Sequence, residues 1–213
     1  MSMKNFLIIV MVTLGLSGCI SLAGNQHAPL ITSYVLEDAG HPRLAATTNH
    51  RTVLIPDTST NAFYNTDSIA FSRAPGTRGL YQYARWTERP GKRLSELLLR
   101  RLEAERIFAT VASSGSGIKG DWLLDTRLLA FYHQASTAPG SVRVELRAEV
   151  TDLHHRTLVA RKLFTVDVPA PTYNAAGAVT AFNTATGQLL DDIGNWLESL
   201  PTQESAATGS KLP

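Results

Sequence analysis

The amino-acid sequence predicts an α+β fold: a mainly antiparallel sheet with two helices packed on one face, as a two-layer sandwich. The first observation is the alternation over residues 142–150, where apolar residues take turns with Arg143, Glu145, Arg147 and Glu149. A period of two is typical of a strand that has one face in water. The second observation is a pair of segments whose apolar residues recur at helical spacing.

Short apolar or β-branched runs predict the strands that precede this alternating segment. They lie at residues 33–37, 51–56, 68–73, 79–85 and 121–134. The turn-forming sequence APGT separates the third run from the fourth, so these two are expected to pair as a hairpin. The fifth run is mostly apolar, which predicts a central strand buried on both faces. After the turn HHRT, residues 158–169 are expected to return as an antiparallel strand.

Two helices are predicted from the position of their apolar residues. In residues 91–108 one stripe is made of leucines, with Arg100, Arg101 and Glu103 placed on the other side. The leucines of this stripe are Leu94, Leu97, Leu98 and Leu102. The second helix is predicted over residues 174–200. Its first half is rich in Ala and Gly, and such small side chains let a helix approach its neighbours closely, so this half is expected to pack tightly.

The amino terminus predicts export and lipidation. Lys4 precedes an apolar run over residues 6–16, which is about as long as the apolar part of a signal peptide. A membrane-spanning helix needs about 20 apolar residues, so the run is too short for one. Residues 16–19, Leu-Ser-Gly-Cys, resemble the bacterial lipobox. This resemblance implies cleavage before Cys19, attachment of a lipid to the Cys19 thiol and acylation of the new amino terminus.

Cys19 is the only cysteine of the chain, which excludes intramolecular disulfides. The next residue, Ile20, is not acidic, and by resemblance to the sorting rule of enterobacterial lipoproteins this favours the periplasmic face of the outer membrane. Removal of residues 1–18 from the 213-residue chain leaves 195 residues and, because only Lys4 is charged among them, changes the formal charge from +2 to +1. A charge so close to balance argues against a non-specific polyanion binder, so nucleic acid is not expected as a partner.

The chain is expected to hold one folded domain. Residues 1–18 are the predicted signal peptide, and residues 19–31 are the predicted lipidated terminus and tether. The domain is expected over residues 32–200, because no linker divides this stretch and its length is enough for a sizeable core. Residues 201–213 lack apolar periodicity, which predicts a disordered tail.

The sequence offers no convincing set of residues for catalysis, for a metal or for a cofactor. His154 and His155 lie in a predicted turn and are expected to be solvated, whereas His133 is expected to be structural. Asp191 and Asp192 are neighbours on a predicted helix, where side chains diverge by about 100°, so they are expected on a solvated face. We therefore predict that the protein is not an enzyme, and that it needs no metal or cofactor.

The sequence YQYARWTERP, residues 81–90, combines aromatic and basic side chains. Trp86 is predicted to close the core beneath the helix that follows, since large aromatic side chains dominate cores. Tyr81, Tyr83 and Arg85 are the candidate partner-binding residues, because aromatic residues and Arg are enriched at the energetic centres of interfaces. The alternative for both tyrosines is a purely structural place on one face of a strand.

The order of these features resembles one family, the auxiliary lipoprotein components of ABC-type transport systems. The resemblance spans roughly residues 32–200. The residues that carry it are the lipobox, Tyr34-Val35-Leu36, the segment from Tyr81 to Pro90 with the leucine-rich helix after it, LRAEVTD at 146–152 and a last helix that ends in NWL. It implies that residues 32–200 are a domain of this family, with a non-enzymatic role in moving lipids or other hydrophobic molecules between the two membranes.

The same resemblance implies the partners. Such lipoproteins work with periplasmic proteins of the mammalian-cell-entry type, and indirectly with a permease and an ATPase in the inner membrane. The lipoprotein would hold the outer-membrane end of the system through its lipid anchor. The alternative is an envelope lipoprotein that binds a cell-wall or outer-membrane component as an assembly factor. Antiparallel sheet edges are compatible with a dimer or a ring, so a homo-oligomer is also possible.

Overall fold

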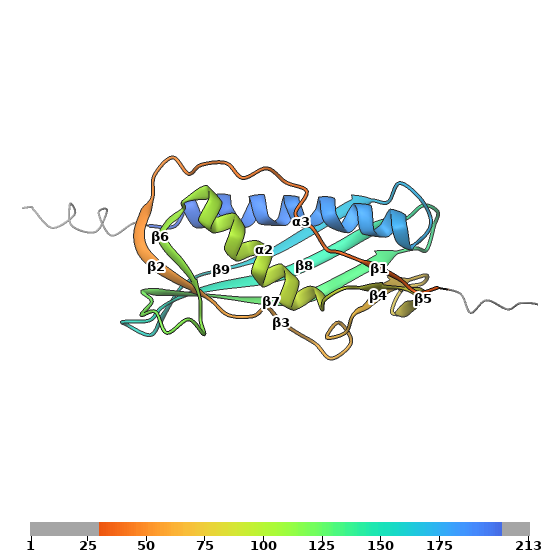
Figure 1. Ribbon diagram of the computed structural model, residues 1–213, viewed down its shortest axis with the longest axis horizontal. Coiled ribbons are helices and arrows are strands. Elements are labelled where there is room, and N and C mark those ends of the chain that lie inside the picture. The colour runs from red at the N-terminus through yellow and green to blue at the C-terminus, as the bar shows by residue number, and fades with distance from the viewer. Residues whose placement is uncertain (1–29, 202–213) are drawn as a thin grey trace, which may run out of the picture. The chain divides into compact units, whose positions relative to one another are not determined.

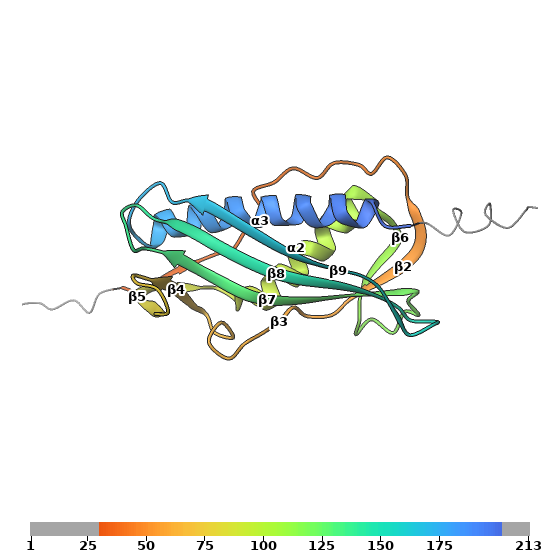
Figure 2. The same cartoon turned by 180° about the vertical axis from the view of Figure 1, so that it is seen from behind.

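The computed structural model describes residues 30–201, which form an α+β body (Figure 1). Its helices are α2 (Pro90–Glu105) and α3 (Ala175–Glu198). Its strands are β1 (Thr32–Tyr34), β2 (Asn49–Ile55), β3 (Ser59–Thr60), β4 (Ser68–Ser72), β5 (Gly79–Trp86), β6 (Phe108–Ser113), β7 (Trp122–Gln134), β8 (Ser141–Asp152) and β9 (Thr157–Pro169). The helices lie in front of the strands in Figure 1 and behind them in the reverse view of Figure 2. The predicted arrangement, with both helices on one face, is confirmed.

Strand β7 organises the sheet. One edge of β7 pairs antiparallel with β8 over its whole length, and β9 returns antiparallel on β8. The other edge is shared by three short parallel strands, with β2 near the start of β7, β3 near its middle and β4 near its end. Strands β4 and β5 form the predicted hairpin. The sheet is therefore mixed, and its longest pairings are antiparallel. Strand β9 pairs only with β8 among the described strands, so it forms an edge.

The alternation predicted for β8 is confirmed, because every second residue is buried and the intervening charged residues are not. The buried set is Val142, Val144, Leu146, Ala148 and Val150. The prediction that β7 is buried on both faces is wrong. Asp125 and Arg127 are exposed, while Thr126 and Leu128, which alternate with them, are buried. The reason is that both helices cover the same face of the sheet, so the other face of β7 stays in contact with water.

Helix α2 begins at Pro90. In the first turn of a helix the N–H groups have no acceptor within the helix, so the missing N–H of proline removes no hydrogen bond. All four leucines of its predicted stripe are buried. Helix α3 begins after Asn174, whose side chain accepts a hydrogen bond from the Gly177 N–H at 2.9 Å. The small residues of its first half pack closely, as predicted, since Ala178 and Ala181 are almost completely buried. Among residues 30–201 no helix is long and apolar enough to cross a membrane.

The chain between β1 and β2, residues 35–48, passes over the outer side of both helices (Figure 1), and we call it the crossing segment. It is held at both helices. The Arg93 side chain of α2 donates to the Leu36 carbonyl at 2.9 Å, and the Asn183 side chain of α3 accepts from the Glu37 N–H at 3.0 Å. Because the chain leaves the sheet after Tyr34, β1 is shorter than the strand predicted over residues 33–37.

Arg101 corrects the prediction for the outer side of α2. Its side chain was expected in water, but it is 1% exposed because the crossing segment covers it. The guanidinium donates to both carboxylate oxygens of Asp38, at 2.6 and 2.8 Å. It also donates to Glu105, one turn along α2, and to Asp191 of α3. The Asp191 side chain is 46% exposed, in line with the expected solvated face, but it also pairs with this buried cation.

Two strands are absent from the prediction. Strand β3 is only two residues long, which is too short for a pattern to show. Strand β6 follows α2 almost at once and pairs in parallel with β2. Its sequence is FATVAS, and the helix predicted over residues 91–108 wrongly included Phe108, the first residue of this strand.

Candidate functional site

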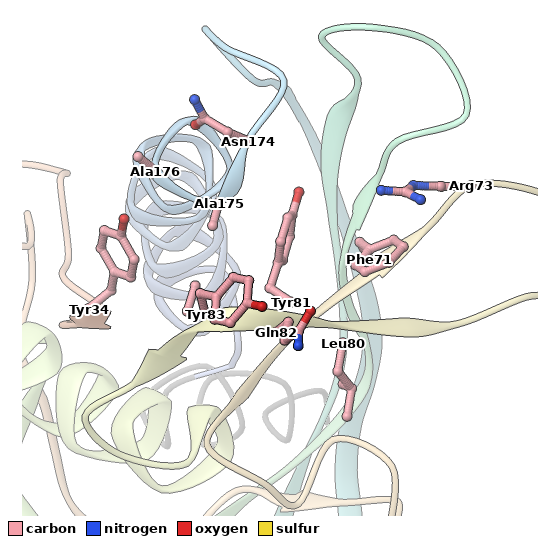
Figure 3. Close-up of a pocket in the computed structure, with 11 residues that line it drawn as sticks. Tyr34, Phe71, Arg73, Leu80, Tyr81, Gln82, Tyr83, Asn174, Ala175 and Ala176 are labelled. Atoms are coloured by element: carbon pink, nitrogen blue, oxygen red, sulfur yellow. The ribbon is translucent and has the colours of Figure 1, made fainter. Parts of the chain in front are cut away.

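A cleft of about 570 Å³ opens between β5 and the first turn of α3 (Figure 3). Its walls are mostly aromatic and aliphatic, with Arg73 as the charged residue among those that line it. Tyr34 of β1, Phe71 of β4, and Tyr81 and Tyr83 of β5 supply its rings. We call this feature the aromatic cleft.

The pairing of β4 with β5 is irregular beside the two tyrosines. Ser68 lies opposite Arg85, but Ala70 lies opposite Leu80, so β5 carries extra residues between these two pairs. Such a bulge breaks the simple alternation of faces and redirects side chains. In Figure 3, Tyr81 extends toward the first turn of α3 and Tyr83 lies beside it, while Leu80 points the other way.

His133 of β7 holds Tyr81 in place. The His133 ring is wholly buried, with Nε2 2.9 Å from the Pro139 carbonyl oxygen and Nδ1 2.7 Å from the Tyr81 hydroxyl. A carbonyl oxygen can only accept, so Nε2 carries the proton and Nδ1 accepts from the tyrosine. Burial lowers the pKa of His133, and burial also raises the pKa of Tyr81. Both groups are therefore neutral at pH 7, and the expectation that His133 is structural agrees with this geometry.

Replacing His133 with glutamine is expected to remove a pH dependence of stability. The pKa of His133 is lower in the folded chain than the ordinary value of about 6.5. The neutral ring therefore contributes to folding stability above that pH, and this contribution is lost as the pH falls below it. Urea unfolding of the unchanged protein should show lower stability at about pH 5.5 than at about pH 7.5. At the higher pH, the His133 variant should have a free energy of unfolding about 1–3 kcal/mol lower than that of the unchanged protein. Acidification to about pH 5.5 should lower the stability of the variant by less than that of the unchanged protein.

The matched control for this prediction is His50→Gln, because His50 is exposed on β2. This control should keep the full pH dependence. An equal dependence in the unchanged protein and in the His133 variant would show that the buried ring does not cause it.

The three predicted partner-binding residues do not all lie together. Tyr81 and Tyr83 line the cleft, and the Tyr83 side chain is 46% exposed there. Arg85 is not among the lining residues, and its guanidinium lies 3.5 Å from Asp67. Both partners of this ion pair are nearly half exposed, so the pair contributes little to stability. Cys19, the predicted lipid-attachment site, lies outside the described residues.

The prediction for Trp86 agrees with the structure. Its side chain is 2% exposed and lies against Phe131 of β7 and Phe182 of α3, with ring centroids 5.8 and 5.3 Å away. The same stretch of sequence therefore supplies a core residue and two cleft residues.

Three further residues line the cleft but were not predicted as site residues: Tyr34, Phe71 and Arg73. Tyr34 and Phe71 fell within predicted strands, where an aromatic residue is ordinary, and only their place in the sheet brings them to Tyr81. The guanidinium of Arg73 lies 4.9 Å from the centre of the Phe71 ring, so it forms a cation–π contact at the rim.

The chemistry that the cleft offers is binding. Aromatic walls take apolar chains or side chains, and the hydroxyls and Arg73 give polar contacts at the edge. Within residues 30–201 no group of three His, Cys, Asp or Glu side chains is arranged to hold a metal ion. His154, in the turn between β8 and β9, pairs with Asp121 at 2.9 Å, and the side chains of both are at least 38% exposed.

The fold and the cleft define the class of the protein, an α+β domain with an aromatic cleft between β5 and α3. The chain belongs to the ABC-type transport auxiliary lipoprotein component family, whose model matches residues 34–194. It is therefore an auxiliary lipoprotein component of ABC-type transport systems, anchored to a membrane of the cell envelope. The family resemblance seen in the order of the sequence features is confirmed. No curated protein sequence matches the chain.

Solved structures share the fold. Protein XCC0632 from Xanthomonas campestris superposes with a TM-score of 0.71 at 20% identity, over 83% of this chain and 100% of that one. An uncharacterized protein superposes with a TM-score of 0.63 at 10% identity, over 79% of this chain and 99% of that one. A more distant similarity is to the PelC dodecamer from Paraburkholderia phytofirmans, with a TM-score of 0.42 at 12% identity, over 73% and 92% of the two chains.

Proposed function

We propose that this protein is an outer-membrane lipoprotein that faces the periplasm and serves an intermembrane lipid transport system of the ABC and mammalian-cell-entry type. Its role is non-enzymatic. The observation that carries the proposal is the family match over residues 34–194, which makes the chain an auxiliary component of ABC-type transport. The lipobox that ends at Cys19, with Ile20 after it, supports the outer membrane as the place of anchoring.

In this proposal the aromatic cleft is where the lipoprotein meets the transport machinery. A periplasmic protein of the mammalian-cell-entry type contacts Tyr81 and Tyr83, while Arg85 lies beside the cleft as a rim contact. Exposed aromatic side chains that are already held in place lose little freedom on binding, which favours them as interface anchors. Tyr81 is fixed by His133, and Tyr83 is exposed next to it. The permease and the ATPase are connected to the lipoprotein only through this partner.

Crosslinking in intact cells tests the proposal. A photo-reactive amino acid in place of Tyr83 is expected to capture the mammalian-cell-entry protein of the same organism, identified by mass spectrometry. The matched control is the same amino acid in place of Leu158, which is 51% exposed on β9, at the opposite end of β9 from the loop that leads to the cleft. Equal capture at both positions, or capture of only a cell-wall or outer-membrane assembly component at Tyr83, would contradict the transport role.

A further inference from the structure

Three loops meet at one end of the described body, beside the aromatic cleft. They are residues 73–78 between β4 and β5, residues 135–140 between β7 and β8, and residues 170–174 between β9 and α3. The Ala135 N–H donates to the carbonyl of Ser72, the last residue of β4, at 2.7 Å, which holds the second loop next to the start of the first. The Ala170 N–H donates to the Gly140 carbonyl at 3.0 Å, which joins the last two. We call these three loops together the tether-end surface.

The charge of the tether-end surface is one-sided. Its three loops contain two arginines, Arg73 and Arg78, and not one Asp or Glu. Both arginines are exposed, and within residues 30–201 neither forms an ion pair with a carboxylate. Asp167 lies two residues inside β9 and is neutralised by Arg143 at 3.1 Å. At the opposite end of β7, by contrast, Asp121 and Asp152 flank the loops.

Aromatic and aliphatic side chains accompany the arginines. Tyr173 is 47% exposed in its loop, and its hydroxyl donates to the Ala135 carbonyl at 2.6 Å, so its ring is held in place. Leu80, the second residue of β5 after the first loop, is 44% exposed. The arginines are also pre-arranged, because Arg73 stacks on Phe71 and the Arg78 guanidinium lies 3.7 Å from the centre of the Tyr132 ring. Arg with Tyr and Leu, and without carboxylates, is the composition that favours the interface of a membrane with anionic lipids.

The described chain begins on the same side of the body as the tether-end surface. Strand β1 runs parallel to β5, with Thr32 opposite Ala84, so the chain before Thr32 comes from the side where β5 begins. That side is where residue 78 ends the first loop. Leu30 and Ile31, at the start of the described chain, are 90% and 51% exposed. Leu30 is eleven positions after Cys19, so even a fully extended chain keeps Leu30 within about 40 Å of the lipid-attachment site.

We propose that the tether-end surface docks on the anionic lipid headgroups of the membrane that carries the anchor. Arg73 and Arg78 contact the headgroups, and Leu80 and Tyr173 enter the interfacial layer. The aromatic cleft then opens next to the bilayer. A short tether makes even weak docking effective, because it keeps the local concentration of lipid high. This inference goes beyond the proposed function and rests on it only for the anchor at Cys19.

Vesicle binding without any anchor tests the docking directly. The protein used begins at residue 19 and carries Cys19→Ser, and it keeps every core residue because the core lies within residues 36–197. We expect it to sediment with vesicles of phosphatidylethanolamine and phosphatidylglycerol, and to bind less as salt is raised. The double variant Arg73→Glu with Arg78→Glu should lower the partition coefficient by about 25-fold or more, since each basic residue contributes on the order of fivefold.

The matched control is Arg100→Glu with Arg127→Glu, which makes the same charge change at exposed positions on α2 and on the open face of β7. This control should keep the partition coefficient within about twofold of that of the parent protein, because only charges close to the membrane surface are attracted to the anionic headgroups. Absence of vesicle binding, or an equal loss in both double variants, would overturn the docking. The assay contains no transport protein and no lipidated residue, so its failure is separate from a failure of the crosslinking experiment.

A second measurement checks the orientation. Because Cys19 is the only cysteine, Ser136→Cys or Ser116→Cys gives a single thiol in the Cys19→Ser background. Ser136 lies in the tether-end surface and Ser116 lies in the loop before β7, and both are exposed. A fluorophore at position 136 should be quenched by lipids that carry a nitroxide, while one at position 116 should not. Quenching at position 116 alone, or at both positions equally, would overturn the proposed orientation.

Discussion

Replacing Arg101 with methionine is expected to lower the free energy of unfolding by about 3–5 kcal/mol at neutral pH. The substitution keeps a long side chain under the crossing segment but removes the cation. Asp38, Glu105 and Asp191, which all accept hydrogen bonds from the guanidinium, then face one another without a compensating positive charge. Removing one partner of a buried ion pair costs more than the pair contributes, because the remaining charge stays buried. Urea unfolding of the two proteins measures the difference.

The cost of this substitution should also depend on pH. Burial raises the pKa of Glu105 above its ordinary value, and both Arg101 and the backbone N–H of Arg43 oppose that rise. Without Arg101 the pKa in the folded chain rises further. A carboxyl whose pKa is raised by folding stabilises the fold while it is protonated, and this contribution is lost as the pH rises through the folded pKa. The deficit of the Arg101 variant should therefore shrink as the pH is lowered from about 7 toward the ordinary Glu value of about 4.3.

Arg100→Met is the matched control, because Arg100 is exposed one residue earlier on the same helix. It should change the free energy of unfolding by less than about 0.5 kcal/mol. A deficit of similar size in both variants, or a deficit for Arg101→Met that is independent of pH, would contradict the role given to the buried guanidinium.

Replacing Cys19 with alanine is expected to abolish lipidation. The lipobox ends in the only thiol of the chain, so no second side chain can form the thioether. Cells fed an alkyne-bearing fatty acid should label the unchanged protein strongly and the variant at background level. The variant should also disappear from the outer-membrane fraction. Fatty-acid labelling that survives in the variant would show that the anchor has been assigned to the wrong residue.

The residue after the cysteine supplies the control. Ile20→Asp keeps the thiol, so it should keep the full label, but an acidic residue at this position is expected to hold the lipoprotein in the inner membrane. Labelling and membrane fractionation of the two variants thus separate attachment of the lipid from delivery to the outer membrane.

The elements that the sequence predicted well are those fixed by local periodicity. The alternation in β8 and the leucine stripe of α2 each record which face meets the core, so residues close in sequence were enough. Arg101 shows the limit of this reasoning. Its partners Asp38 and Asp191 lie 63 and 90 residues away, and the crossing segment that buries it has no periodic pattern. The two-sided burial expected for β7 failed for a related reason, because hydrophobicity alone does not tell which face the helices cover.

The candidate site was only partly predictable. Tyr81 and Tyr83 were found because they stand close together in an aromatic–basic stretch. Tyr81 and Tyr83 are two residues apart, so the alternation of a regular strand already places them on one face. Their place beside α3, however, comes from the tertiary fold. Tyr34 joins them only because β1 pairs with β5. Arg85 shares the stretch but lies outside the cleft, so closeness in sequence was a poor guide at that position.

Among the described strands, β9 leaves one edge without a partner, and such an edge affects how molecules held on one membrane interact. Anchored molecules diffuse in a plane, so they collide more often than the same molecules free in solution. An open strand edge presents unpaired N–H and C=O groups that can pair with a strand of another molecule. Arg161 and Lys162 stand on this strand as exposed cations next to Leu163, which is 56% exposed. Charged side chains on an edge discourage indiscriminate strand-to-strand growth. We therefore expect these cations to lower the tendency of membrane-anchored copies to aggregate through this edge.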